Sequence, residues 1–207
     1  MQRISCALGV LSLAFAPLAL AVPDENGALV DPNAATESIA SDAEMTARLN
    51  YNVGFEDFEK ATRLELQVGT KKGAELRALE AEVRKGFNSA RERFRAALEA
   101  DPNMKEAWNM VGYTSRRLGD YEESLIAYER ALALAPDYPE AIEYRAELFV
   151  LTGRFDEVKD AYASLQKSSP SYAETLKNAI LDWSKDRNAP GAKAPGRDAF
   201  VAWAKAL

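Results

Sequence analysis

The side chains that could carry out chemistry in this sequence are carboxylates and amines, because none of the 207 residues is a histidine. Without an imidazole, the sequence cannot form Ser-His-Asp or Cys-His triads, and it lacks the ligand of most catalytic zinc sites. Adjacent carboxylates, such as Glu122–Glu123 and Glu56–Asp57, could in principle form a general acid–base pair. Both pairs lie among strong helix formers, a pattern that is typical of solvated helix faces. We therefore predict that the chain is not an enzyme.

Cofactor and metal sites are not predicted either. The segment Gly69-Thr-Lys-Lys-Gly73 contains glycines and lysines, but it lacks the G-x-x-x-x-G-K-[ST] spacing of a phosphate-binding loop, and the sequence shows no metal-ligand spacing. The 26 Lys and Arg residues and 32 Asp and Glu residues give a formal net charge of −6. This charge argues against a nucleic-acid partner, which requires a basic surface. The remaining function class is the binding of a protein or peptide partner.

The first 21 residues have the pattern of a cleaved signal peptide. Arg3 supplies a positive charge, residues 5–20 are almost wholly apolar or small, and Ala19-Leu20-Ala21 has the small-x-small pattern that signal peptidase recognises. The alternative is a transmembrane anchor, which needs roughly 20 consecutive apolar residues, whereas this stretch is shorter and contains Pro17. We predict export to the periplasm, or secretion, after cleavage near Ala21, with no stable membrane span in the mature chain.

Composition divides the rest of the sequence into four parts. Residues 22–41 contain prolines, a glycine and acidic residues but few large apolar side chains, so we predict a flexible acidic arm. Residues 42–185 are rich in Ala, Leu, Glu, Lys and Arg and show no strand-like alternation, which predicts helices. Residues 186–197 hold two Pro-Gly pairs and are interpreted as a linker. Residues 198–207 are a short amphipathic helix, which we expect to pack on the preceding helices unless a partner binds it.

The helical part repeats with a period of 34 residues. Pro102, Pro136 and Pro170 have this spacing, as do Gly119 and Gly153. Each proline is followed by a possible capping box, and these are Asn103 with Glu106, Asp137 with Glu140, and Ser171 with Glu174. The pattern predicts pairs of helices in which a glycine forms the turn and a proline ends the second helix. One such pair cannot cover its own apolar face, so successive pairs must stack.

These motifs resemble those of the tetratricopeptide repeat family. Its W-x-x-L-G opening is matched by Trp108-x-x-Val111-Gly112, and its inter-helix turn by Leu118-Gly119-Asp120-Tyr121. The resemblance implies an all-α fold in which helix-turn-helix repeats stack into a short superhelix, with an elongated first hairpin and a C-terminal capping helix. The units implied are repeat 1 at about 47–102, repeat 2 at about 103–136, repeat 3 at about 137–170 and the cap helix at 171–185.

Repeat 1 is longer than the others. Residues 50–54 mirror residues 108–112, but the second helix of repeat 1 follows 24 residues later than in repeat 2. The insert is rich in helix formers and has one break at residues 68–73. We therefore predict that both helices are lengthened by about 12 residues, or roughly 18 Å, at about 1.5 Å per residue. Gly86 is interpreted as a local bend in the second helix.

The repeat register also predicts a core. Five side chains from the two helices of repeat 2 are expected to be buried between stacked helices. They are Trp108, Val111, Tyr128, Ala131 and Leu132.

The family resemblance implies a binding surface as well. In the family, the first helix of each pair lines an inner groove that holds a peptide or helix of a partner. In this chain the groove would present aromatic side chains beside two arginines and a glutamate, namely Tyr51, Phe55, Asn109, Tyr113, Arg116, Arg117, Tyr144 and Glu147. These residues indicate a non-catalytic interaction module, a scaffold or adaptor of the cell envelope. Alternatively, the aromatic side chains only pack against neighbouring helices or the C-terminal segment.

A second function class is structural. The long hairpin or the C-terminal helix could mediate self-assembly into a homo-oligomer, or could attach the chain to an envelope complex. In that case the inner groove would be filled by segments of the chain itself.

Overall fold

The computed structural model describes residues 22–23, 29–30 and 32–207. The predicted signal peptide, residues 1–21, lies outside the described residues. The chain divides into two compact units, Met1–Asp42 and Ala43–Leu207. In the first unit, the described residues form the antiparallel strand pair β1 (Val22–Pro23) and β2 (Leu29–Val30) and the start of helix α1.

The predicted flexible arm is wrong from residue 32 onward. Helix α1 (Pro32–Glu65) includes the last ten residues of the segment 22–41. A proline is well suited to the first position of a helix, because its fixed φ is helical and its missing N–H would have no partner there. Ala34, Ala35 and Glu37 follow it and favour the helix. Pro32 therefore starts a helix instead of marking a loop.

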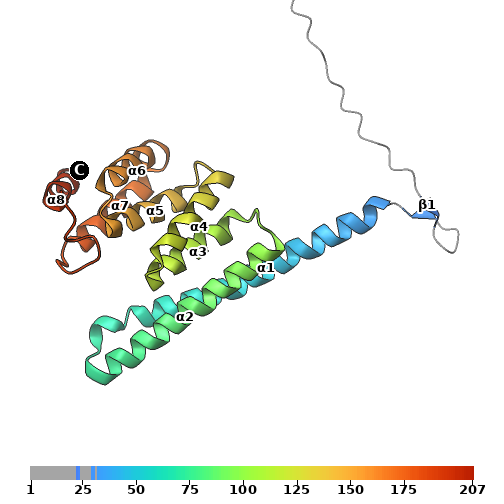
Figure 1. Ribbon diagram of the computed structural model, residues 1–207, viewed down its shortest axis with the longest axis horizontal. Coiled ribbons are helices and arrows are strands. Elements are labelled where there is room, and N and C mark those ends of the chain that lie inside the picture. The colour runs from blue at the N-terminus through green and yellow to red at the C-terminus, as the bar shows by residue number, and fades with distance from the viewer. Residues whose placement is uncertain (1–21, 24–28, 31) are drawn as a thin grey trace, which may run out of the picture. The chain divides into compact units, whose positions relative to one another are not determined.

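The second unit is a stack of helices (Figure 1). After α1 come the short 3-10 helix η1 (Val68–Thr70) and the helices α2 (Gly73–Ala100), α3 (Lys105–Leu118), α4 (Tyr121–Leu134), α5 (Pro139–Thr152), α6 (Phe155–Ser168), α7 (Pro170–Trp183) and α8 (Arg197–Ala206). Consecutive helices pair and stack, which confirms the predicted all-α repeat architecture with an elongated first hairpin. Among the described helices, none is both long enough and apolar enough to span a membrane.

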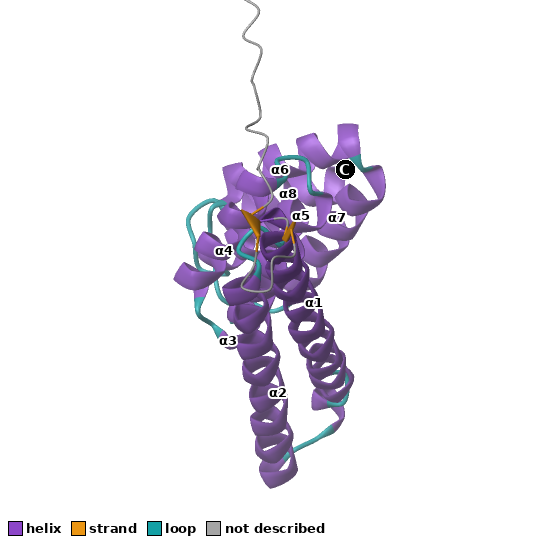
Figure 2. Cartoon of the chain, turned by 90° about the vertical axis from the view of Figure 1, so that its right-hand side faces the viewer, coloured by secondary structure: helices purple, strands orange, loops and turns teal. Residues whose placement is uncertain are grey.

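The elongated hairpin is formed by α1 and α2, which run side by side (Figure 2). Equivalent contacts in the first two pairs show how the insert is accommodated. A Cβ on Gly54 would lie 3.0 Å from the ring of Phe94, and a Cβ on Gly112 would lie 2.5 Å from the ring of Tyr128. The first two residues are 40 positions apart and the second two are 16 apart, so the 24 inserted residues lie beyond this contact, on the side of the turn between the two helices.

The predicted extension by helix is confirmed, but its even division between the two helices is wrong. Beyond this contact α1 is longer than α3 by about 5 residues and α2 is longer than α4 by about 14, because α1 ends at Glu65 and α2 begins at Gly73. The remaining 5 residues lie in the turn between them.

Gly86 does not interrupt α2. A Cβ at this position would lie 2.8 Å from the Cβ of Ala61, which is fully buried on α1. The absence of a side chain therefore lets the two long helices approach each other closely. Next to this contact, the rings of Phe58 and Phe87 are 6.3 Å apart. The interpretation of Gly86 as a bend is replaced by a packing role.

The predicted capping boxes are not formed. The N-cap residues of α3, α5 and α7 are Met104, Tyr138 and Ser169, and none of them makes a side-chain cap hydrogen bond. After Pro102 the chain first makes a turn, in which Asp101 Oδ1 accepts a hydrogen bond from the backbone N–H of Asn103 at 2.9 Å. This local turn competes with capping and delays the start of α3. Pro170 does not end a helix but begins α7.

The glycine turns agree with the prediction. Gly119 and Gly153 follow the last residues of α3 and α5 with φ values of 88° and 74°. This left-handed conformation costs other residues more than glycine, because a Cβ would be crowded there. The two turns therefore reverse the chain at the same point of successive repeats.

The predicted core is confirmed in three of five positions. Val111, Tyr128 and Ala131 are buried between helices. Trp108 and Leu132 are only half-buried and pack at the edges of the apolar clusters. Trp108 lines a groove between α2 and α4. How far Trp108 is buried depends on the spacing of the neighbouring helices, which the repeat pattern does not specify.

The C-terminal helix packs on its own chain, as expected. Phe200 of α8 is 1% exposed, and its ring stacks on that of Phe155 with the centroids 4.4 Å apart. The segment before α8, interpreted as a linker, forms successive turns against α5. A Cβ on Gly191 would lie 2.3 Å from the carbonyl oxygen of Val150, so a side chain cannot be accommodated there. The contact between Phe200 and Phe155 thus buries the apolar face of α8 against the same chain.

Candidate binding surfaces

A row of aromatic side chains crosses the first helices of the three pairs. It comprises Tyr51, Phe55 and Phe58 on α1, Tyr113 on α3 and Tyr144 on α5, and we call this surface the inner face. The ring of Phe58 lies 5.5 Å from that of Phe55 and 5.1 Å from that of Tyr113, which in turn lies 5.0 Å from Tyr144. The first contact is tilted and the other two are edge-to-face, and aromatic rings attract one another at these distances. The structure therefore brings the four predicted aromatic residues into one continuous row.

Exposure differs along the row. Phe55 is 38% exposed, whereas Tyr51, Tyr113 and Tyr144 are half-buried. Burial also raises the pKa of Tyr113 to about 12, because the lowering effect of the Arg116 charge is smaller than that of burial. The phenol of Tyr113 therefore stays neutral over the physiological pH range. The rings pack on one another, as the alternative interpretation expected, yet they leave apolar surface open around Phe55.

The two predicted arginines are engaged within the chain. Arg116 is 7% exposed, forms an ion pair with Glu147 and places its guanidinium carbon 5.0 Å from the centre of the Tyr113 ring. Arg117 forms an ion pair with Glu65 of α1. Arg116 is therefore held within the chain and is not a free charge on the surface. Its charge is balanced by a residue 31 positions later in the sequence, which becomes a neighbour only when α3 and α5 stack.

Asn109 is also buried, at 3% exposure. Glu143 on α5 is buried too, at 1% exposure, and lies near Glu147 and Arg116. Burial and the adjacent charge of Glu147 raise the pKa of Glu143 to about 9, although Arg116 opposes the shift. Asn109 Oδ1 and Glu143 Oε1 have no hydrogen-bond partner among the described residues. Asn109 therefore contributes to the interior and not to the open surface.

A small pocket lies at one end of the inner face. Its volume is about 180 Å³, and it is formed by the C-terminal halves of α3, α5 and α7. Arg116, Arg117 and Glu147, three of the predicted site residues, line it together with Val150, Leu151, Ala179 and Trp183. The predicted residues thus separate into an aromatic region around Phe55 and a charged pocket.

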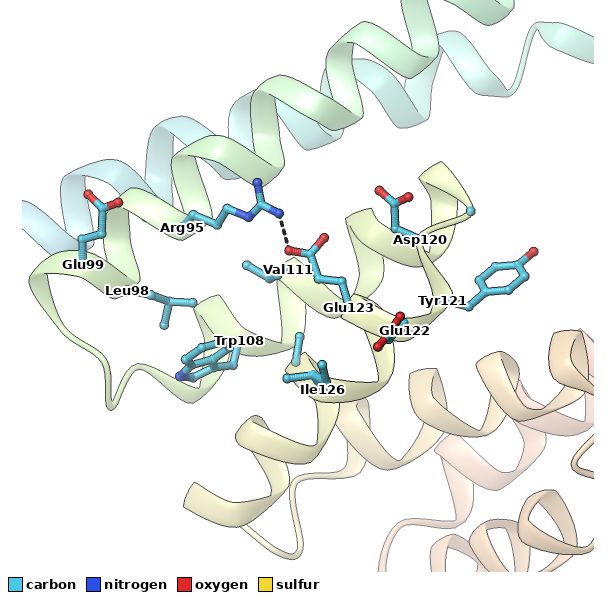
Figure 3. Close-up of a pocket in the computed structure, with 12 residues that line it drawn as sticks. Arg95, Leu98, Glu99, Trp108, Val111, Asp120, Tyr121, Glu122, Glu123 and Ile126 are labelled. Atoms are coloured by element: carbon cyan, nitrogen blue, oxygen red, sulfur yellow. Dashed lines mark hydrogen bonds and ion pairs between the residues drawn. The ribbon is translucent and has the colours of Figure 1, made fainter.

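A larger groove lies outside the predicted site. It has a volume of about 950 Å³ and runs between α2 and α4, with α3 beneath it (Figure 3). We call it the outer groove, and it is lined by Arg95, Leu98, Glu99, Trp108, Val111, Gly119, Asp120, Tyr121, Glu122, Glu123, Ile126 and Ala127. Sequence reasoning missed it because the family's groove positions lie only on first helices. The apolar Ile126 in the second helix of repeat 2 is a sequence signal that could have indicated the groove, and the structure leaves it 51% exposed.

One member of each carboxylate pair considered for catalysis is engaged in structural contacts. Glu123 accepts hydrogen bonds from Arg91, Arg95 and, at 2.7 Å, from the hydroxyl of Ser115. Partial burial raises the pKa of Glu123, but the bonds from Arg95 and Ser115 outweigh this effect and hold the pKa below its ordinary value. Asp57 accepts a hydrogen bond from Ser89 across the long hairpin at 2.6 Å. Within residues 22–23, 29–30 and 32–207, no cluster of acidic residues could hold a metal ion.

Comparison with known protein families identifies the repeats. The tetratricopeptide repeat family model matches the chain twice, over residues 76–139 and 116–173. The first match covers most of α2 and all of α3 and α4, and the second extends to the beginning of α7. The chain has no significant match among curated proteins. The helix pairs within residues 76–173, with their glycine turns, are therefore similar to tetratricopeptide repeats.

Proposed function

We propose that this protein is a non-catalytic interaction module that binds a peptide or helical segment of a partner protein along its inner face. Tetratricopeptide repeats generally mediate protein–protein interactions as scaffolds. The observation that carries the proposal is the aromatic row, because Phe55 remains 38% exposed although it is a large apolar side chain. Binding energy at protein interfaces is concentrated in such aromatic anchors.

The charges around the row support a partner segment with apolar anchors. Arg116 and Arg117 are each paired with a glutamate of the same chain, so they offer little net charge to a ligand. Glu140 of α5 is likewise occupied, since its carboxylate accepts a hydrogen bond from the hydroxyl of Tyr172 at 2.6 Å. Recognition on this face would therefore rest on apolar contacts with the exposed aromatic edges, supported by the remaining polar groups.

Position 55 allows a direct test of this proposal. A photoreactive phenylalanine analogue at position 55 is expected to crosslink the partner in cells, whereas the same analogue at position 134 is not. Leu134 is a suitable control because it is a 42% exposed apolar residue on α4, away from the inner face. The crosslinked protein is identified by mass spectrometry and its affinity for the purified chain is then measured.

The affinity measurement decides the outcome. Phe55→Glu is expected to weaken binding of the identified partner at least about tenfold, because a charge replaces an apolar anchor. Leu134→Glu is expected to leave the affinity unchanged. Both variants should keep the melting temperature within a few degrees, since both side chains are exposed. Equal binding by Phe55→Glu and the unmodified chain would exclude the inner face as the site.

We further infer that the protein works in the cell envelope after export. The support is the charged, apolar and small-residue pattern of residues 1–21. The intact mass of the protein isolated from its host is expected to correspond to a chain that begins at Val22. A mass that includes residues 1–21 would contradict the inference.

A further inference from the structure

The outer groove has an apolar floor and one open apolar wall. Leu98, Val111 and Ala127 line its bottom and are at most 9% exposed, whereas Ile126 on the wall is 51% exposed. The indole Nε1 of Trp108 donates a hydrogen bond to the carbonyl oxygen of Pro102 at 2.8 Å. Because this polar edge already has a partner, the indole ring can offer apolar surface to a ligand without leaving a donor unsatisfied.

The rim of the groove is acidic. Four carboxylates and a single arginine, Arg95, line it. Asp120 and Glu123 are neutralised by Arg91 and Arg95, but Glu99 on α2 and Glu122 on α4 have no ion pair among the described residues. Figure 3 shows Glu99 toward one end of the groove and Glu122 toward the other. A ligand with positive charges on both flanks would therefore meet a carboxylate at each end.

The walls of the groove also restrict the backbone conformation of a ligand. They are helices, whose backbone N–H and C=O groups bond within each helix, so an extended peptide finds no strand edge with which to pair. A helical ligand satisfies its own backbone and presents apolar side chains at i, i+3 and i+4. Phosphate-bearing ligands, including nucleic acid and anionic lipid, would be repelled by the acidic rim.

We propose that the outer groove is a second interaction site, which binds a cationic amphipathic helix of a partner protein. The apolar face of that helix lies on Leu98, Trp108 and Ile126, and its lysine or arginine side chains meet Glu99 and Glu122. The volume of about 950 Å³ is sufficient for several apolar side chains. This site is formed by α2, α3 and α4 and does not depend on the inner face.

A defined peptide tests the proposal. The probe is a blocked peptide of about 15 residues that contains leucines at i, i+3, i+4 and i+7 and lysines elsewhere on its flanks. Its binding to the mature full-length chain is measured by calorimetry. We expect a dissociation constant on the order of 10 μM that weakens with added salt. The same peptide with glutamates in place of the lysines is expected not to bind.

Variants of the chain locate the bound peptide. Ile126→Asp is expected to weaken binding of the lysine peptide at least about tenfold, and Glu99→Gln combined with Glu122→Gln should weaken it several-fold and reduce its salt dependence. The matched control is Leu134→Asp, an exposed apolar position on the same helix, which should bind like the unmodified chain. Absence of binding by the lysine peptide, or equal binding by Ile126→Asp, would overturn the proposal.

The inner face provides the remaining control. Phe55→Glu should leave binding of the lysine peptide unchanged if the peptide lies in the outer groove. Loss of binding in Phe55→Glu, but not in Ile126→Asp, would place the peptide on the inner face. That result would contradict the outer site while leaving the proposed function intact.

Discussion

Phe200→Ala is expected to lower the free energy of unfolding by about 3–5 kcal/mol, the range found when a fully buried phenylalanine is truncated. The ring of Phe200 lies among those of Phe155, Trp183 and Trp203, with centroid distances of 4.4, 6.2 and 5.5 Å. Removing it leaves a cavity that these rigid aromatic side chains cannot readily fill. Urea denaturation followed by tryptophan fluorescence would measure the loss.

Leu207→Ala is the matched control, because this residue follows the same helix and is 41% exposed. Its effect should stay within about 0.5 kcal/mol. A loss below about 1 kcal/mol for Phe200→Ala, together with rapid hydrogen exchange in α8, would show that α8 is detached from the stack in solution. The helix would then be free for a partner or for self-assembly, as the second function class requires.

Glu143→Gln is expected to stabilise the protein at pH 8 and to flatten the pH dependence of its stability. Glu143 is 1% exposed, and burial together with the charge of Glu147 raises its pKa from 4.5 to about 9. Glutamine has nearly the same shape but needs no proton to be neutral. The gain at pH 8 should be about 1–3 kcal/mol, since the cost of burying or protonating the carboxylate is removed.

The sign of this dependence follows from proton binding. Between pH 4.5 and about 9 the folded chain retains a proton on Glu143 that the unfolded chain has released. The free energy of unfolding therefore falls as the pH rises through this window, by up to about 1.4 kcal/mol per pH unit. The stability that protonated Glu143 contributes is fully present below the pKa of the unfolded chain. Denaturation curves at several pH values would test this, with the exposed Glu82→Gln as control. An unchanged slope in Glu143→Gln would contradict the assignment.

The repeat architecture could be predicted from the sequence because its determinants are local. Gly119 and Gly153 mark the turns, since the left-handed conformation there favours glycine whatever surrounds it. Gly112 and Tyr128 occupy equivalent places to Gly54 and Phe94, so even the 24-residue insert could be located. The start of α1 was missed because Pro32 is compatible with both a loop and the first turn of a helix.

The sequence by itself determined which helices form, where they turn and that they stack, because these features depend on periodicity and on residues close together in the chain. Only the tertiary structure decided which side chains remain exposed to solvent. Arg116 is buried where α5 places Glu147 beside it, and Trp108 is only half-buried because it lines the groove between α2 and α4. Burial of this kind depends on the spacing between elements, which the pattern of a single helix does not specify.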